Sequence, residues 1–198
     1  MPIETGDNSA ASPPPTRRIP IATIVVLTAA AIVSIVQFFQ PALLDLLGRR
    51  PGALAERGWW RIVTPLFVHS EGWPHLLFNI AWIGWVGTII ERRLGSRRWL
   101  ILYFVPGIIG ELIGLVWKPH GGGASLGGSG LLGALCVWLL LRAVHRPWRI
   151  RIWGPLGLAT ALVLTLRHEV HGPPILIGAA LAAVMMSPRG RLTNRPAR

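Results

Sequence analysis

Four polar side chains lie in otherwise apolar stretches and have the types that acyl-transfer chemistry needs. Ser129 supplies a hydroxyl, and His171 supplies an imidazole that can take its proton. His75 and Asn79 supply N–H donors. A serine becomes nucleophilic beside a base, and fixed N–H donors stabilise the oxyanion that forms. Because a charge at the bilayer centre costs about 2.5–3.5 kcal/mol on insertion scales, polar residues in such stretches need a reason.

The spacing of these residues carries further information. Ser129 ends the glycine-rich stretch 121–129 and precedes an apolar run, which predicts a hydroxyl at a helix N-terminus, where free N–H groups can bind an oxyanion. Close packing and tight turns are the ordinary explanation of such glycines. His75 and Asn79 are four apart and share one helix face. No acid is well placed for His171, since Glu169 can face water, so the prediction is a Ser–His dyad.

Long apolar runs must position these residues. Of the 198 residues, 52% are hydrophobic and 14% are charged, against about 25% charged in soluble proteins. Runs of nearly 20 apolar residues cross about 30 Å of hydrocarbon. We therefore predict an all-α membrane protein with six transmembrane helices, at about 19–39, 75–90, 99–117, 125–141, 152–166 and 171–187. A signal peptide is the rival interpretation of the first run, but its apolar core is normally only about 7–15 residues.

The regions outside the spans complete the predicted organisation. Residues 1–18 are a proline-containing tail that we expect to be disordered, 19–187 form the membrane domain, and 188–198 are a basic tail. The mixed stretch 41–73, rich in Trp and Arg, predicts a first loop that lies in the membrane interface. The single cysteine, Cys136, and the lack of a Cys/His pattern predict no metal and no cofactor.

The net charge of +12 is distributed as in membrane proteins. Basic residues form short clusters between apolar runs, which argues against a nucleic-acid-binding surface. Six spans put both termini and most of these clusters on one side, so the positive-inside rule predicts cytoplasmic termini in the cell membrane. The second, fourth and sixth spans then begin outside. His75, Ser129 and His171 are therefore expected at one depth, in the outer part of the bilayer.

Several short motifs follow one another in a defined order. They are Trp60-Arg61, Phe67-Val-His69, His75-Leu-Leu-Phe-Asn79, the run from Gly87 through Glu91 to Gly95, Gly127-Gly-Ser129-Gly130, and His171 with Gly178. In order, spacing and topology they resemble the rhomboid family of intramembrane serine proteases, over about residues 20–187. The resemblance implies a rhomboid-like bundle whose substrates are single-span membrane proteins, entering from the lipid bilayer and cut near their outer end.

The resemblance also implies roles for individual residues. Ser129 is the expected nucleophile and His171 the general base. His75, Asn79 and the backbone N–H of Ser129 are the expected oxyanion hole. The remaining motif positions are expected to be structural: Trp60, Arg61, Glu91, Gly127, Gly130 and Gly178.

Two departures from the family pattern stand out. Gly133 occupies the position four residues after Ser129, where the family usually has an aromatic residue packed on the histidine. Pro174 follows His171 by three residues, where the family usually has the glycine that lets this helix approach the fourth closely. His168 competes with His171 for the motif, but it fits less well because Ile175 follows it by seven residues. These departures motivate a catalytically inactive protein that binds membrane clients as the alternative to a protease.

A small transporter or channel subunit is the third hypothesis, because intramembrane polar residues occur there too. Neither paired acids across spans nor an inverted repeat supports it. Glu111, inside the third span, has no role in any of these hypotheses.

Overall fold

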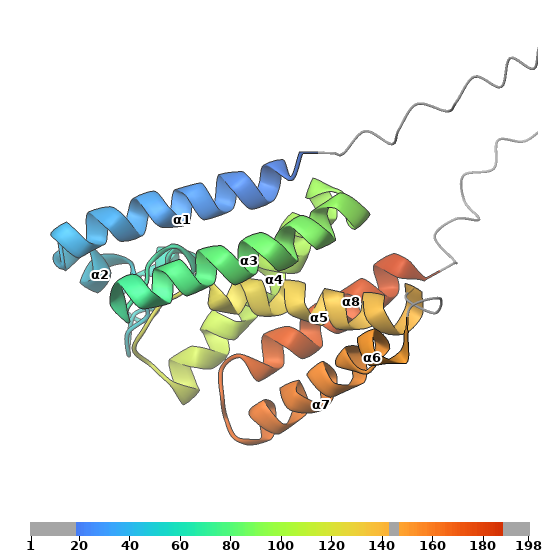
Figure 1. Ribbon diagram of the computed structural model, residues 1–198. Coiled ribbons are helices and arrows are strands. Elements are labelled where there is room, and N and C mark those ends of the chain that lie inside the picture. Colours follow the sequence, from blue (N-terminus) through green and yellow to red (C-terminus); the bar gives the residue numbers. More distant parts are fainter. Residues whose placement is uncertain (1–18, 143–146, 188–198) are drawn as a thin grey trace, which may run out of the picture.

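The computed structural model describes residues 19–142 and 147–187, so both predicted tails lie outside the described residues. The described chain is helical. Its elements are α1 (Ile21–Phe39), α2 (Ala42–Leu47), the 3-10 turns η1 (Trp59–Ile62) and η2 (Thr64–Phe67), α3 (Gly72–Leu94), α4 (Ser96–Trp117), α5 (Ser125–Arg142), α6 (Trp148–Arg151), α7 (Trp153–Leu166) and α8 (Gly172–Met186). All six predicted spans are confirmed as helices, the fifth being α6 together with α7 (Figure 1).

Four helices are long and apolar enough to cross a membrane: α1, α3, α4 and the α6–α7 stretch Trp148–Leu166. α5 and α8 are apolar but shorter. Large hydrophobic side chains face outward on the outer helices, among them Val25 on α1, Phe78 on α3 and Leu162 on α7. This pattern suits a lipid solvent, and the chain is a multi-pass membrane protein.

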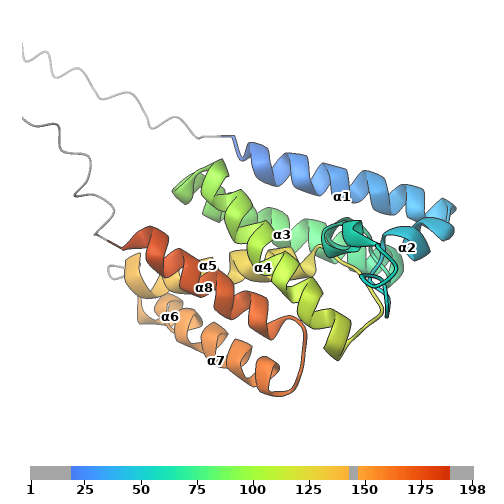
Figure 2. The same cartoon turned by 180° about the vertical axis from the view of Figure 1, so that it is seen from behind.

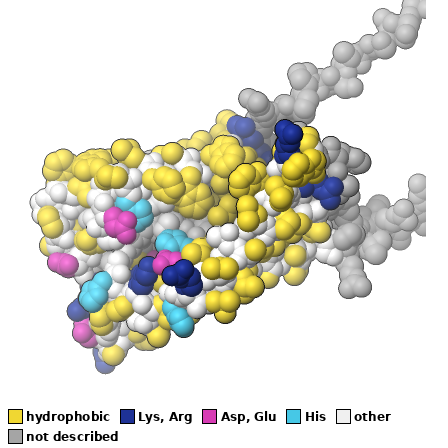
Figure 3. All heavy atoms as spheres, turned by 60° about the horizontal axis from the view of Figure 1, so that its bottom comes forward, with side chains coloured by type: hydrophobic (Ala, Val, Ile, Leu, Met, Phe, Trp, Pro, Cys, Tyr) yellow, Lys and Arg dark blue, Asp and Glu magenta, His cyan; other side chains and the backbone are white. Residues whose placement is uncertain are grey.

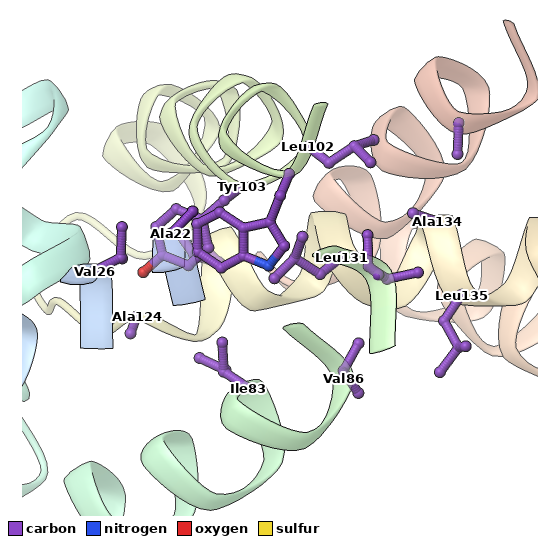
Figure 4. Packing of buried hydrophobic residues seen from close by; sticks show 14 of the residues in the cluster. Ala22, Val26, Ile83, Val86, Leu102, Tyr103, Ala124, Leu131, Ala134 and Leu135 are labelled. Carbon is purple, nitrogen blue, oxygen red and sulfur yellow. The ribbon is translucent and has the colours of Figure 1, made fainter. Parts of the chain in front are cut away.

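α5 is the central helix of the bundle, surrounded by α3, α4, α7 and α8 (Figures 1 and 2). Side chains from α1, α3 and α4 meet it in the core shown in Figure 4, among them Val26, Ile83 and Leu102. Glycines on α5 allow this packing. A Cβ on Gly127 would lie 2.5 Å from the Tyr103 ring, so no larger residue fits there without movement.

α8 packs directly against α5, contrary to what Pro174 suggested in the sequence. A Cβ on Gly178 would overlap the carbonyl oxygen of Gly130, and one on Gly133 would overlap that of Ile175. Pro174 instead faces α4, where a Cβ on Gly110 would lie 2.6 Å from its Cγ. Small residues elsewhere on both helices therefore replace the missing glycine at 174.

Hydrogen bonds from tryptophan and arginine side chains to its own backbone hold the first loop in shape. Trp60 Nε1 donates to the Leu46 carbonyl at 2.9 Å, and the buried Arg61 guanidinium donates to the Gly48 carbonyl at 2.7 Å. Trp59 and Trp60 remain exposed, as expected for a loop at a membrane interface.

Glu91, buried near the end of α3, fastens the start of α1. Its carboxylate accepts the backbone N–H groups of Ala22 and Thr23 at 2.7 and 2.8 Å, and the Ser96 hydroxyl at 2.6 Å. The first N–H groups of a helix have no partner within it and carry partial positive charge, so a carboxylate there is stabilising. Glu91 thereby joins α1, α3 and α4.

Candidate active site

A polar cavity of about 330 Å³ lies where α3, α5 and α8 begin. Its lining includes His75, Asn79, Ser125 and His171. Figure 3 shows histidine and charged side chains gathered at this end of the molecule, with hydrophobic side chains over much of the surface beyond it. The three helix starts predicted to share one depth therefore do meet around one space.

The hydroxyl that meets His171 belongs to Ser125. Its Oγ lies 3.1 Å from His171 Nε2. Ser129, the predicted nucleophile, is 4% exposed, and its hydroxyl donates to the Ser125 carbonyl at 2.8 Å. The reason is the start of α5: the helix begins at Ser125, so Ser129 lies one turn deeper and bonds back to residue i−4. In the structure His171 Nε2 therefore contacts Ser125, and no hydrogen bond joins Ser129 to His171 among the described residues.

If the Gly-x-Ser-Gly motif is counted from Ser125, different positions depart from the family pattern. The segment reads Gly123-Ala-Ser125-Leu126, with leucine in the place of the second glycine of Gly-x-Ser-Gly. The position four residues on is Ser129 when the motif is counted from Ser125, and Gly133 when it is counted from Ser129. Gly123 leaves room for the site: a Cβ there would lie 2.7 Å from His75 Cε1 and 3.3 Å from Ser125 Oγ.

Glu169 contacts the other nitrogen of His171, which corrects the prediction that no acid is well placed. His171 Nδ1 lies 2.9 Å from Glu169 Oε1, and Lys118 Nζ donates to Glu169 Oε2. Desolvation raises the pKa of Glu169, but the hydrogen bonds and charges of Lys118 and His171 outweigh it and hold this pKa below its usual range. An ionised carboxylate only accepts, so Nδ1 carries the proton and the free Nε2 accepts the hydroxyl of Ser125.

Asn79, which lines the same cavity, has a side-chain donor without a partner among the described residues. The side chain is 1% exposed, and its Oδ1 accepts the indole N–H of Trp82 at 2.8 Å. Its Nδ2 is buried and has no hydrogen-bond partner among the described residues. Leaving a buried donor without a partner costs about 1–3 kcal/mol. A donor kept in this state is therefore a candidate to bind a ligand. His75 Nε2 also faces the loop before Ser125, 3.0 Å from where a Gly123 Cβ would be.

His69 lies behind His75 and was predicted only as part of a motif. The two rings meet edge to face with centroids 5.0 Å apart. His69 Nδ1 lies 2.7 Å from Ser34 Oγ, whose hydroxyl donates to the Phe67 carbonyl, so Nδ1 is the donor. Desolvation and then the neighbouring His75 lower the pKa of His69 to about 4. His69 is therefore neutral at pH 7 and braces His75.

Glu111, for which the sequence suggested no role, forms a buried ion pair with Arg49 of the first loop. Arg49 Nε also donates to the Lys118 carbonyl at 2.8 Å, and the Arg49 N–H donates to the Gly121 carbonyl at 2.8 Å. These bonds fasten residues 118–121, just ahead of Ser125, to the first loop. The pair therefore fixes the approach of the chain to the site.

Comparisons with known proteins all point to one family. A model of the Rhomboid domain matches residues 56–186. The chain is 41% identical over 90 residues to Rhomboid protease GluP of Bacillus subtilis (strain 168), covering 44% of this chain and 18% of that protein. It is 26% identical over 136 residues to Rhomboid protease GlpG of Salmonella choleraesuis (strain SC-B67), covering 63% and 48%.

One relative is named as inactive. Inactive RHOMBOID-like protein 8 of Arabidopsis thaliana is 32% identical over 93 residues, covering 46% of this chain and 25% of that protein. The chain spans less than half the length of each of these three relatives. The Rhomboid domain model matches most of this chain, and the structure has six apolar helices around a polar cavity. The chain therefore belongs to the rhomboid family.

Proposed function

We propose that this protein is an intramembrane serine endopeptidase in which Ser125 is the nucleophile and His171 the general base. The observation that carries the proposal is the 3.1 Å contact between Ser125 Oγ and His171 Nε2, in a cavity that also holds the free Asn79 amide. Ser129, which matches the family motif by sequence, lacks this contact and is one helical turn deeper.

Acylation follows from these positions. Ser125 Oγ attacks the carbonyl carbon of the scissile peptide bond while its proton passes to His171 Nε2. The carbonyl electron pair moves to oxygen, and the oxyanion accepts hydrogen bonds from Asn79 Nδ2, His75 Nε2 and the Ser125 backbone N–H. The C–N bond then breaks, His171 returns its proton to the leaving nitrogen, and the acyl group stays on Ser125 as an ester.

Water completes the cycle. His171 Nε2 takes a proton from a water molecule, whose oxygen attacks the ester carbon. The C–O bond to Ser125 breaks, Ser125 Oγ recovers the proton, and the new carboxyl terminus leaves. The cavity at the helix starts supplies a polar route for this water.

The substrates we propose are single-span membrane proteins, because α5 and α8 are embedded in an apolar bundle and the site lies at their outer ends. The clusters of arginine at the far end, including Arg92, Arg93 and Arg97, support cytoplasmic termini in a cell membrane. Cleavage then falls near the outer end of the substrate helix.

A catalytically inactive, client-binding protein is the second candidate. Leu126 in the place of the motif glycine, and the likeness to a relative named as inactive, favour it. The hydrogen-bonded Ser125 and His171 favour the protease, because binding a client needs neither.

Cleavage by single variants distinguishes these assignments. We expect purified wild-type protein in lipid vesicles to cut a single-span substrate, Ser125→Ala to lose cleavage by more than about 10³-fold, and Ser129→Ala to retain it within about tenfold. Ser129→Ala is the matched control, since it removes the same hydroxyl one turn away. Loss of cleavage only in Ser129→Ala would restore that residue as the nucleophile. A folded wild type that cuts no substrate tested would favour the client-binding alternative.

A further inference from the structure

We propose that Glu169 and Lys118 form a charge couple that selects the Nδ1–H tautomer of His171 and sets its basicity, which makes Glu169 a positioning residue. This inference rests on the proposed function of Ser125 and His171. Its structural basis is one continuous chain of contacts: Lys118 Nζ to Glu169 Oε2, Glu169 Oε1 to His171 Nδ1 at 2.9 Å, and His171 Nε2 to Ser125 Oγ at 3.1 Å.

The turn between α7 and α8 holds Glu169 in place. The Glu169 N–H donates to the Leu164 carbonyl at 2.9 Å, and the Glu169 carbonyl accepts the Gly172 N–H at 3.1 Å. His168 adopts a left-handed backbone with φ of 56° and packs its ring edgewise on Trp117, with centroids 5.0 Å apart. Gly172 has no space for a side chain, since a Cβ would overlap the Thr165 hydroxyl. The carboxylate is therefore presented to His171 by ordered backbone.

The ionised carboxylate determines the tautomer. Because Glu169 accepts from Lys118 on one oxygen, its other oxygen accepts the Nδ1–H of His171 and leaves the Nε2 lone pair facing Ser125. The same negative charge stabilises the imidazolium that forms when Ser125 loses its proton. Lys118 opposes this second effect, because its positive charge partly cancels that of Glu169. The two residues thus push the basicity of His171 in opposite directions.

Other charged and titratable groups share the cavity with His171 and act alongside the couple. Among the charged groups of the described residues, Glu169 is the one that hydrogen-bonds the His171 imidazole. The further groups that line the cavity are Arg49, Glu71, His75, Glu111, Lys118 and His120. Glu111 and Arg49 form an ion pair with each other. The electrostatic potential at His171 is then set mainly by Glu169, Lys118, Glu71, His75 and His120.

The pH dependence of kcat/KM measures this effect. The acidic limb reports protonation of the general base in the free enzyme. In Glu169→Gln we expect this limb to move to lower pH and kcat to fall at least about tenfold, because the imidazolium loses its counter-charge. In Lys118→Gln we expect the limb to move to higher pH by a smaller amount, since Lys118 is 52% exposed. Glu56→Gln, which removes an exposed carboxylate of the first loop, is the control and leaves the limb unmoved.

Nitrogen NMR of the histidines gives a readout that needs no turnover. In the full chain labelled with 15N-histidine in micelles, assigned by loss of signal in His171→Gln, we expect Nδ1 protonated and Nε2 bare at pH 8. The pH at which these nitrogen signals change should move down in Glu169→Gln and up in Lys118→Gln. A bare Nδ1, or shifts in one common direction, overturns the couple even if cleavage occurs. The predicted shifts with no cleavage and no Ser125 chemistry would uphold the couple and refute the proposed function alone.

Discussion

Asn79→Ala separates catalysis from stability. The variant removes the buried Nδ2 donor, which has no partner in the described structure, and also the Oδ1 that accepts from Trp82 at 2.8 Å. Relieving an unsatisfied donor returns about 1–3 kcal/mol, and losing the indole bond costs about 0.5–1.5 kcal/mol. The free energy of unfolding should therefore lie between about 0.5 kcal/mol below and about 2.5 kcal/mol above that of the wild type. Removing one oxyanion donor lowers kcat by about 10²–10³-fold.

Gln37→Ala is the matched control for this variant. Gln37 is a buried amide on α1 with both ends satisfied, donating to the His69 carbonyl at 3.1 Å and accepting the His69 N–H at 3.0 Å. Its truncation should lower stability by about 1–3 kcal/mol while the rate per folded molecule falls less than tenfold.

Two measurements on the same vesicle preparations suffice. One is initial cleavage rate with a single-span substrate, and the other is the midpoint of thermal unfolding. The reasoning fails if Asn79→Ala unfolds several degrees below wild type, or if its rate per folded molecule matches wild type. Either result would mean that the free amide of Asn79 is structural and binds no oxyanion.

Three further outcomes follow from the packing and the charges. Glu91→Gln should lower stability by about 1–2 kcal/mol, seen as a lower unfolding midpoint, because α1 loses the carboxylate on its first N–H groups; an unchanged midpoint would contradict this. Gly178→Ala should prevent close packing on Gly130 and reduce the folded yield, whereas Gly84→Ala, with 3.5 Å to the Leu27 side chain, should be tolerated; equal yields would refute the packing argument. His69 has a folded pKa near 4, below its unfolded value of 6.5, so the unfolded state binds more protons and stability falls as pH drops from 6.5 to 4. That loss is on the order of 3 kcal/mol, and His69→Gln should flatten the dependence of unfolding midpoint on pH in this range.

The six helices were predictable because each coincides with an apolar run, and four of these helices are long enough to cross a membrane. Topology alone also predicted that His75, Ser129 and His171 lie at one depth, near the starts of their helices. These inferences need only the order of the spans and the side on which each begins.

Two serines share one glycine-rich segment, so the sequence pointed to Ser129 as the nucleophile, whereas we propose Ser125. Ser129 matches Gly-x-Ser-Gly in letters, while Ser125 is followed by Leu126. Which serine faces the cavity depends on where α5 begins, and close contacts such as that of Gly127 with Tyr103 fix this register. A signal was present: Ser125 opens the predicted span 125–141, level with His75 and His171 at the starts of theirs.

The remaining contacts join residues that are distant in sequence or depend on turn geometry. Glu111 meets Arg49 across 62 positions, and Lys118 meets Glu169 across 51. Glu169 contacts His171 two residues on, after a turn in which His168 has a left-handed backbone conformation. No periodicity or motif predicts such a turn, so the sequence predicted a dyad where the structure shows four residues in contact: Lys118, Glu169, His171 and Ser125.

Active-site labelling tests the role of Ser125 most directly. Wild-type protein in vesicles is treated with a fluorophosphonate, digested, and the modified peptide is mapped by mass spectrometry. We predict a single adduct on Ser125 Oγ that is absent from His171→Ala. An adduct on Ser129, or none on a folded protein, would contradict Ser125 as the nucleophile.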